Sequence, residues 1–193
     1  MRHDIRLRGH AYEIRPVEMA DAAFILQLRT DPELSRLIHP TSPRLEDQHA
    51  YLQRYFETPG DCYFIVVRSA TGRPEGTVAI YDIGAAPGEA EWGRWIIRQG
   101  SMGAPESALL TYRVAFDVLG VNRIYCRTAA ANRNVIAFHE SCGLQTRAGA
   151  SLTHNFGGKV YDAVEQFMTR MGWPTAERTL DERARAVARL LSR

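Results

Sequence analysis

Residues 91–120 combine a strand, a glycine-containing loop and a long helix, and this combination limits the possible folds most strongly. Residues 91–97 (EWGRWII) are rich in aromatic and β-branched side chains, which favours a strand. Residues 106–119 repeat apolar side chains at helical spacing on two faces, so this helix needs cover on both sides. Gly120 is placed to end it. A strand followed by such a helix predicts layers built around a sheet.

The loop between them, residues 99–105, predicts an anion site. A loop that opens a helix presents unpaired backbone N–H groups at the positive end of the helix dipole, which suits phosphate or pyrophosphate. Gly100 and Gly103 let a ligand approach the backbone closely. The loop contains neither G-x-x-x-x-G-K-[ST] nor G-x-G-x-x-G. A plain strand-to-helix connection that binds nothing is therefore the alternative interpretation.

The composition excludes several functional classes. Of 193 residues, 45% are hydrophobic, which is too many for a disordered chain and enough for one sizeable core. The net charge of +2 is too small to predict a nucleic-acid-binding face. No apolar run approaches the roughly 18 residues that a membrane span needs. The N-terminus (MRHDIRLRGH) lacks the apolar run of a signal peptide. We therefore expect a cytoplasmic protein that binds neither nucleic acid nor a membrane.

Cysteine and histidine spacing predicts no metal site. Cys62, Cys126 and Cys142 form no C-x-x-C pair and are expected as free thiols in the core. The six histidines show no paired metal-ligand spacing.

The rest of the chain predicts one mixed α+β domain on a single sheet. Expected strands cover 10–17, 62–68, 75–82, 121–128, 144–154 and 159–169, and expected helices cover 19–30, 44–57 and 132–141. The last two strands are expected to join through a hairpin turn at 155–158.

A final amphipathic helix follows Trp173-Pro174. Leu180, Ala184, Val187 and Leu191 share one apolar stripe, and Thr179 with Glu182 has the spacing of an N-terminal capping box. The stripe has two interpretations: it docks on the core of its own chain, or on a second subunit in a homodimer.

Residues 132–144 (NRNVIAFHESCGL) form the second informative segment. Asn132 stands at the predicted start of a helix, where asparagine is a favourable cap. His139 lies beside the apolar face of that helix, as a catalytic imidazole or as a hydrogen-bonded core histidine.

Together, the loop with its helix and residues 132–144 resemble the GNAT superfamily of acetyl-CoA-dependent N-acetyltransferases. Asn132, His139, Glu140, Gly143 and Leu144 stand at the matching places of that family's N-x-x-[AS]-x-x-x-Y-[EK]-x-x-G-F segment. The resemblance implies a mostly antiparallel sheet of about seven strands flanked by helices. It implies an acetyltransferase domain over residues 1–172, with 173–193 as an additional C-terminal helix.

The resemblance also implies a site. The strand after Glu91 would hydrogen-bond the pantetheine arm of acetyl-CoA, and the loop amides would hold its pyrophosphate. His139 stands where the family has a tyrosine acid, and its unperturbed pKa of about 6.5 would suit that role. Glu91 is our candidate base, with a strand carboxylate of no catalytic role as the alternative. The implied acetyl-CoA contacts are Trp95, Ile96, Ile97, Arg98, Gly100, Ser101, Met102, Gly103, Ala104, Asn132, Arg133 and Phe138.

The implied acceptor is a primary amine, bound near Arg29, Arg36, His39, Tyr81 and Trp92. It is a small-molecule amine, such as the amino group of a nucleotide-linked sugar, or a peptide N-terminus. The family's loop reads R/Q-x-x-G-x-G/A, and here Gly100 and Pro105 replace its first and last positions. A catalytically silent CoA-binding or scaffold module is therefore the alternative to an enzyme.

Overall fold

A computed structural model describes residues 2–148, 152–156 and 159–192. Its described strands are β1 (Leu7–Arg8), β2 (Tyr12–Pro16), β3 (Cys62–Arg68), β4 (Arg73–Tyr81), β5 (Glu89–Ile97), β6 (Arg123–Ala129), β7 (Gln145–Thr146), β8 (Leu152–Phe156) and β9 (Lys159–Thr169). They form one sheet in the order β1-β2-β3-β4-β5-β6-β9-β7, with β8 paired to β9. Only β5 and β6 pair in parallel; the other described pairs are antiparallel.

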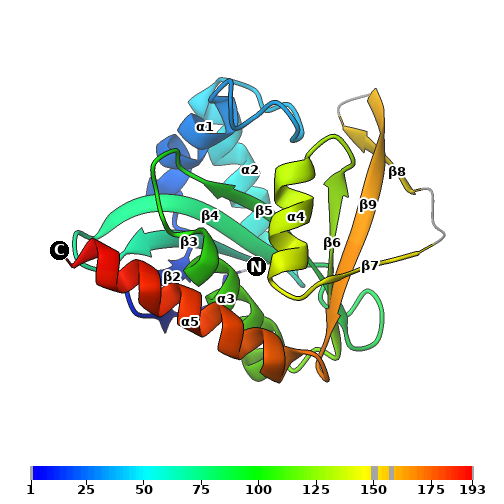
Figure 1. The fold of residues 1–193 in the computed structure, drawn as a ribbon. Coiled ribbons are helices and arrows are strands. Elements are labelled where there is room, and N and C mark those ends of the chain that lie inside the picture. The colour runs from blue at the N-terminus through cyan, green and yellow to red at the C-terminus, as the bar shows by residue number, and fades with distance from the viewer. Residues whose placement is uncertain (1, 149–151, 157–158, 193) are drawn as a thin grey trace.

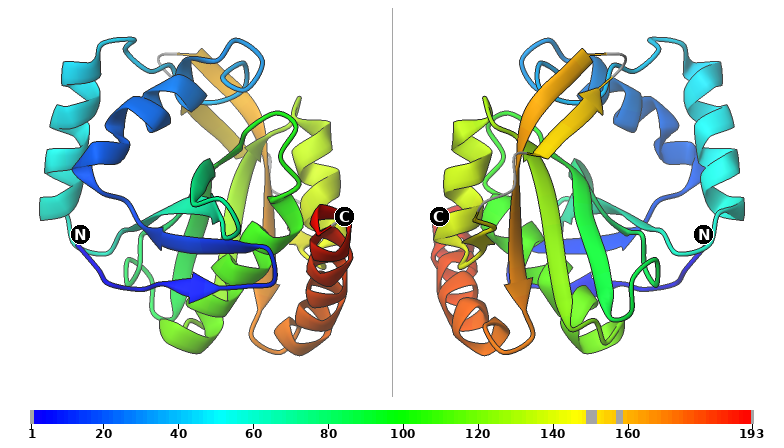
Figure 2. Two further views of the ribbon diagram at one scale, coloured as in Figure 1. Left: turned by 90° about the vertical axis from the view of Figure 1, so that its left-hand side faces the viewer. Right: turned by 90° about the vertical axis from the view of Figure 1, so that its right-hand side faces the viewer.

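Helices cover both faces of this sheet (Figures 1 and 2). They are α1 (Ala22–Thr30), α2 (Leu45–Glu57), α3 (Ala104–Arg113), α4 (Arg133–Ser141) and α5 (Trp173–Leu191). Strand β3 shows why two covers are needed: Phe64 and Val66 pack into the cluster that includes α3 and α5, whereas Tyr63 and Ile65 pack with α1 and α2. The predicted mixed α+β architecture is confirmed.

The described sheet has nine strands where about seven were expected. Residues 7–8 add a short edge strand, and the strand expected over 144–154 is divided into β7 and β8. Residues 149–151 lie outside the described residues, as do 157 and 158 of the expected hairpin turn.

The long helix begins and ends differently from the prediction. It starts at Ala104 rather than Glu106, because Pro105 is favourable in a first helical turn. After Arg113 it widens into a π-helical turn (Val114–Val118), in which Leu119 N–H donates to Val114 C=O at 2.8 Å. Its apolar residues are buried from Ala108 to Phe116, as predicted, whereas Val118 at its end is 50% exposed.

Helix α5 begins at Trp173, so the predicted capping box is wrong. Gly172 occupies the N-cap, and Thr179 lies inside the helix with its hydroxyl donating to Thr175 C=O. The apolar stripe packs against the core, where Leu180 and Ala184 are fully buried.

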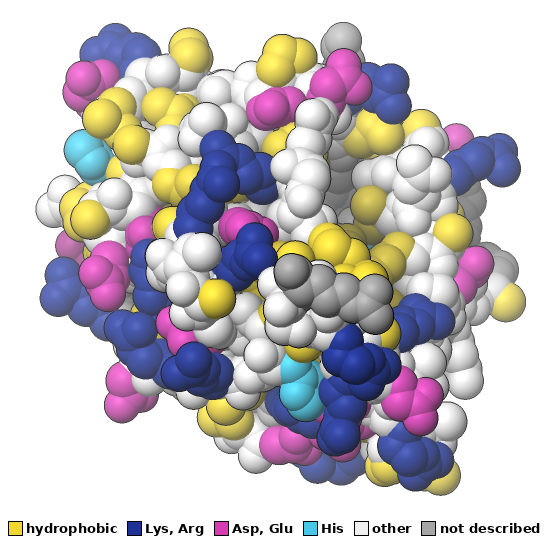
Figure 3. Space-filling model, turned by 60° about the vertical axis from the view of Figure 1, so that its left-hand side comes forward, with side chains coloured by type: hydrophobic (Ala, Val, Ile, Leu, Met, Phe, Trp, Pro, Cys, Tyr) yellow, Lys and Arg dark blue, Asp and Glu magenta, His cyan; other side chains and the backbone are white. Residues whose placement is uncertain are grey.

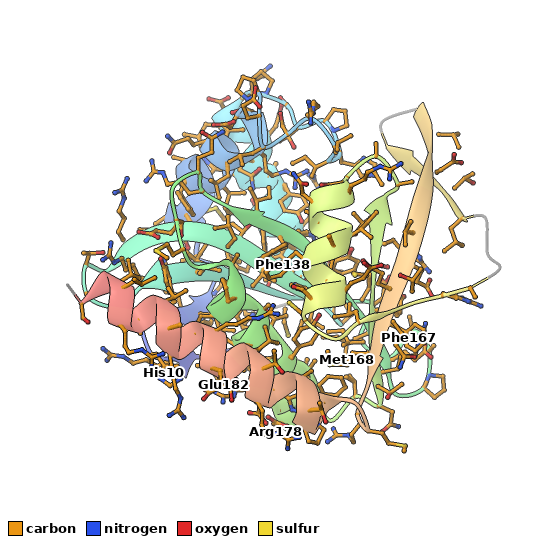
Figure 4. All side chains as sticks on the ribbon, in the orientation of Figure 1. His10, Phe138, Phe167, Met168, Arg178 and Glu182 are labelled. Carbon is orange, nitrogen blue, oxygen red and sulfur yellow. The ribbon has the colours of Figure 1, made fainter. Side chains whose placement is uncertain are left out.

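Figure 4 shows His10 beside α5, where its ring contacts Asp181 at 2.9 Å.

Candidate active site

Strands β5 and β6 share only a short parallel ladder. Their register joins Glu89, Ala90 and Glu91 to residues 123–125. Strand β5 continues to Ile97 and β6 to Ala129, so both strands run on beyond their last shared pair. A strand edge without a neighbouring strand offers backbone N–H and C=O groups to an extended ligand.

A β-bulge shapes β5 at this point. Ala79 pairs with Gly93 and Thr77 with Ile96, so Arg94 and Trp95 stand opposite the single residue between them on β4. Arg94 has φ = 47°, in the left-handed region that only a few non-glycine residues adopt. The Thr77 hydroxyl donates to Arg94 C=O at 2.9 Å and helps hold the bulge. The break in alternation lets both Arg94 and Trp95 face one cavity.

That cavity has a volume of about 650 Å³ and lies between α1, α2 and the diverging strands. It brings together many of the residues singled out from the sequence. They are Arg29, His39, Tyr81, Glu91, Trp92, Trp95, Ile96, Asn132 and His139. Arg36, Ile97, Arg98, Arg133, Phe138 and the loop residues 100–104 are not among its lining residues.

His139 is buried against the tryptophans of β5. Its ring lies edge-on to Trp92 at a centroid distance of 4.6 Å, and only 3% of the residue is exposed. Burial lowers the pKa of His139 to about 4, so the imidazole is neutral at pH 7, unlike the expectation from its unperturbed value. No described residue bonds its Nδ1 atom. A neutral ring with an unpaired buried nitrogen is suited to one hydrogen bond with a ligand.

Glu91 is a buried carboxylate at the point where the strands part. It accepts a hydrogen bond from the Tyr81 hydroxyl at 3.0 Å and pairs with Arg127 at 3.0 Å. Burial raises the pKa of Glu91 although Arg127 and the Tyr81 hydrogen bond both lower it. A carboxylate with a raised pKa that faces a cavity is a candidate general base.

Asn132 and Trp95 both line the cavity, but only Trp95 is fixed by side-chain contacts. Asn132 occupies the N-cap of α4, as predicted, but its side chain makes no capping hydrogen bond. Its amide is therefore not used by the helix. Trp95 Nε1 donates to Ser107 Oγ at 3.0 Å, and its ring stacks on Phe138 at 4.8 Å. Figure 4 shows Phe138 projecting from α4 on the side of β5.

The Ser101 side chain fixes the loop before α3 through two hydrogen bonds. Ser101 Oγ donates to Glu75 Oε2 at 2.6 Å and accepts from the N–H of Gly103 at 3.1 Å, so one expected anion donor is already occupied. Ala104 and Glu106 keep first-turn N–H groups that have no intrahelical acceptor. The Glu106 carboxylate turns back to β2, where it accepts the N–H of Tyr12 at 3.0 Å.

The sequence did not single out several residues of the cavity wall, among them Gln48, Tyr51, Tyr63 and Arg94. Gln48 and Tyr51 lie one helical turn apart on α2, and their spacing could have indicated a shared face. Tyr63 was interpreted only as part of a buried strand. The charge of Arg94 could have been noticed, but not the bulge that turns it inward.

The described residues contain no cluster of three or more His, Cys, Asp or Glu able to hold a metal ion. In the same ranges, no helix is both long and apolar enough to cross a membrane. On the face shown in Figure 3, arginine and acidic side chains are interspersed.

A family model described as the acetyltransferase (GNAT) domain matches residues 12–145. The chain belongs to the GNAT acetyltransferase family. This family uses acetyl-CoA, so this GNAT protein is an acyltransferase. No curated protein matches the chain.

Solved structures share the fold of this GNAT protein. A nucleotide-linked sugar GNAT, FdhC, is 25% identical with a TM-score of 0.77, over 91% of this chain and 96% of that one. A GCN5-related N-acetyltransferase from Brucella melitensis has a TM-score of 0.80 at 17% identity, over 94% of this chain and 86% of that one. The spermidine N-acetyltransferase from Vibrio cholerae, in complex with CoA and spermine, has a TM-score of 0.75 at 18% identity, over 86% of this chain and 99% of that one.

Proposed function

We propose that the protein transfers the acetyl group of acetyl-CoA to a primary amine bound in the cavity between α1, α2 and β5. The observation that carries this proposal is the meeting of three features at one place. The edges of β5 and β6 diverge, a buried carboxylate stands at the fork, and a buried imidazole faces the same cavity. No single element supplies all three.

The residues present fit acetyl-CoA. The edge of β5 beyond Glu91 would pair with the extended pantetheine arm, and the amide of Asn132 would donate to the same arm. The first-turn N–H groups of α3 would bind the pyrophosphate, with Arg98 and Arg133 as further cations. When bound, acetyl-CoA would supply a thioester whose acetyl carbon forms the new C–N bond as the C–S bond breaks. The protonated amine loses two protons in all: one would pass to Glu91 and on to solvent, and the other to the leaving sulfur.

Glu91 is proposed to accept the amine proton, directly or through one water. A protonated amine has no lone pair for attack, so a base is required. The raised pKa of Glu91 makes it a stronger base than an exposed carboxylate, and its ion pair with Arg127 favours the ionised form. The Tyr81 hydroxyl fixes one carboxylate oxygen.

His139 is proposed to assist the leaving sulfur as a neutral hydrogen-bond donor. With a pKa of about 4, only about one ring in a thousand carries the extra proton at pH 7. A role as an imidazolium acid is therefore poorly supported. One neutral hydrogen bond contributes about 0.5–1.5 kcal/mol.

The amine of a nucleotide-linked sugar is our first candidate acceptor, supported by the 25% identity to FdhC. A peptide N-terminal amine is the second. The cytoplasmic location, the homodimer and the division into residues 1–172 and 173–193 stay predictions of the sequence. The packing of α5 on its own core supports the first interpretation of its apolar stripe.

The test has two stages. Calorimetric titration with acetyl-CoA should show micromolar binding, and release of the CoA thiol should then identify amines from an untargeted set. No heat at millimolar acetyl-CoA would overturn the proposal. Acetyl-CoA binding without thiol release for any amine would instead favour the silent CoA-binding module.

A further inference from the structure

We propose that the α1–α2 end of the cavity is an anion subsite, in which Arg29 and Gln48 bind a carboxylate or phosphate group carried by the acceptor. This inference rests on the proposed function and assigns the chemical class of the acceptor. The enzyme would then prefer amines that also carry a negative charge.

Gln48 is the first observation. The residue is 4% exposed, it lines the cavity, and no described residue accepts a hydrogen bond from its Nε2 amide. A buried hydrogen-bond donor without a partner destabilises the protein, because it has lost its bond to water and gained none in return. A bound acceptor of hydrogen bonds removes that cost.

Arg29 is the second observation. Its guanidinium donates to Thr41 Oγ1 at 2.7 Å and to His39 C=O at 3.2 Å, but no described carboxylate pairs with it. Arg94 differs, because Asp61 binds its Nη1 with both oxygens at 2.7 and 2.8 Å. Arg127 is also neutralised, by Glu91 and Glu165. Arg29 is thus the one cavity arginine in the described chain whose charge is not balanced by a carboxylate.

The two residues act in the same part of the cavity. Both residues line the cavity together with Tyr51 and Tyr63, and the Arg94 guanidinium lies 6.0 Å from the Tyr51 ring and 5.4 Å from the Tyr63 ring. Burial raises the pKa of both tyrosines, and the positive charges of Arg29 and Arg94 oppose that rise. Tyr51 follows Gln48 by one helical turn. Gln48 and Arg29 therefore supply a neutral and a charged donor to one end of the cavity.

Asp47 is the acidic residue of the cavity wall on this side. Its carboxylate accepts the Ser42 hydroxyl at 2.5 Å and stands in the first turn of α2, where the helix dipole favours a negative charge. It is exposed, whereas Gln48 is buried. Asp47 therefore leaves the charge of Arg29 available to the inner end of the cavity.

Binding of matched amines tests the inference. The probes are an aminohexose with and without a phosphate ester, a dipeptide with a free or an amidated C-terminus, and spermine. Calorimetry is performed with and without saturating CoA. We expect the anionic member of a pair to bind at least tenfold more tightly. The phosphate and carboxylate pairs distinguish the two sources of charge. Equal affinities within both pairs, or tighter spermine binding, would overturn the inference.

Variants separate binding from packing. Arg29→Gln should weaken the anionic probe at least tenfold and leave its neutral partner and acetyl-CoA unchanged. Thr41→Val removes the shorter of the two hydrogen bonds between Arg29 and the loop but keeps the charge, so an equal loss in both variants would show that Arg29 only holds the loop. Arg54→Gln, on the exposed side of α2, is the control.

Gln48→Leu has a second readout. It should weaken the anionic probe while leaving the melting temperature equal or higher, because a buried unpaired amide is removed. Gln53→Leu, at an exposed position of α2, is the matched control. Unchanged probe affinity in Gln48→Leu would show that the amide only fills space. If the wild-type protein did not bind acetyl-CoA, that result would count against the proposed function. The probe titrations without CoA would still show whether the anion subsite exists.

Discussion

Tyr81 and Glu91 are register partners on β4 and β5, and the Tyr81 hydroxyl donates to Glu91 Oε1 at 3.0 Å. The pair stands at the last residue that β5 shares with β6. A hydrogen-bonded carboxylate is thereby fixed where the sheet opens into the cavity. This relationship links the topology of the sheet to the proposed chemistry.

The pair predicts a pH effect. A hydrogen bond to the ionised carboxylate lowers the pKa of Glu91, so Tyr81→Phe should move the acidic limb of the kcat/KM profile to higher pH. The relative loss should be larger at pH 6 than at pH 8. Glu91→Gln should lower kcat/KM by about 10²- to 10⁴-fold and remove that limb. If the acidic limb does not shift in Tyr81→Phe, a group other than Glu91 causes that limb.

His139 predicts a pH dependence of stability. The unfolded chain binds a proton at this residue below its ordinary pKa of about 6.5, but the folded protein does so only below about 4. Stability should therefore be complete above pH 6.5 and fall as the pH is lowered toward 4, by at most about 3 kcal/mol. His139→Phe should flatten the melting temperature between pH 5 and 7. An unchanged slope would mean that another group causes it.

The same variant separates two catalytic roles. Loss of one neutral hydrogen bond should lower kcat about tenfold, whereas loss of a general acid should lower it by about 10² or more. Single-turnover rates for His139→Phe measure the difference. Acetyl-CoA affinity should change less than turnover.

The start of α3 predicts opposite effects on stability and binding. Ala104→Asp places a negative charge in the first helical turn, which should stabilise the helix by about 0.5 kcal/mol. The same charge should weaken CoA at least tenfold by repelling the pyrophosphate. Thr175→Asp makes the matching change in α5 and should leave CoA affinity unaltered. If Ala104→Asp binds CoA as tightly as the wild-type protein does, the pyrophosphate binds at a place other than the start of α3.

The Arg94–Asp61 pair supports the bulge. Asp61→Asn should destabilise the protein by about 2–4 kcal/mol, because it leaves a largely buried guanidinium without its counter-charge. Denaturant unfolding measures this loss. Glu46→Gln, which breaks an exposed contact with Arg44 at 3.7 Å, should change stability by less than about 0.5 kcal/mol.

Several elements could be predicted because their signals are local. The uninterrupted apolar run of residues 62–67 indicated a strand buried on both faces, and β3 is such a strand. The two apolar faces of residues 106–119 indicated a helix between layers, and α3 with the first three residues of its π-turn is buried there. Thr179 and Glu182 misled because a capping pattern can also occur inside a helix, where packing extends the helix beyond it.

By itself, the sequence determined the order of strands and helices, the family and the segments that carry Glu91, Asn132 and His139, since periodicity and motifs are properties of neighbouring residues. Tertiary structure alone decided that Arg29, Gln48 and Arg94 share one cavity and that β5 bulges. It also decided that His139 is neutral. The physical reason is that desolvation and charge balance depend on which distant residues exclude water from a group.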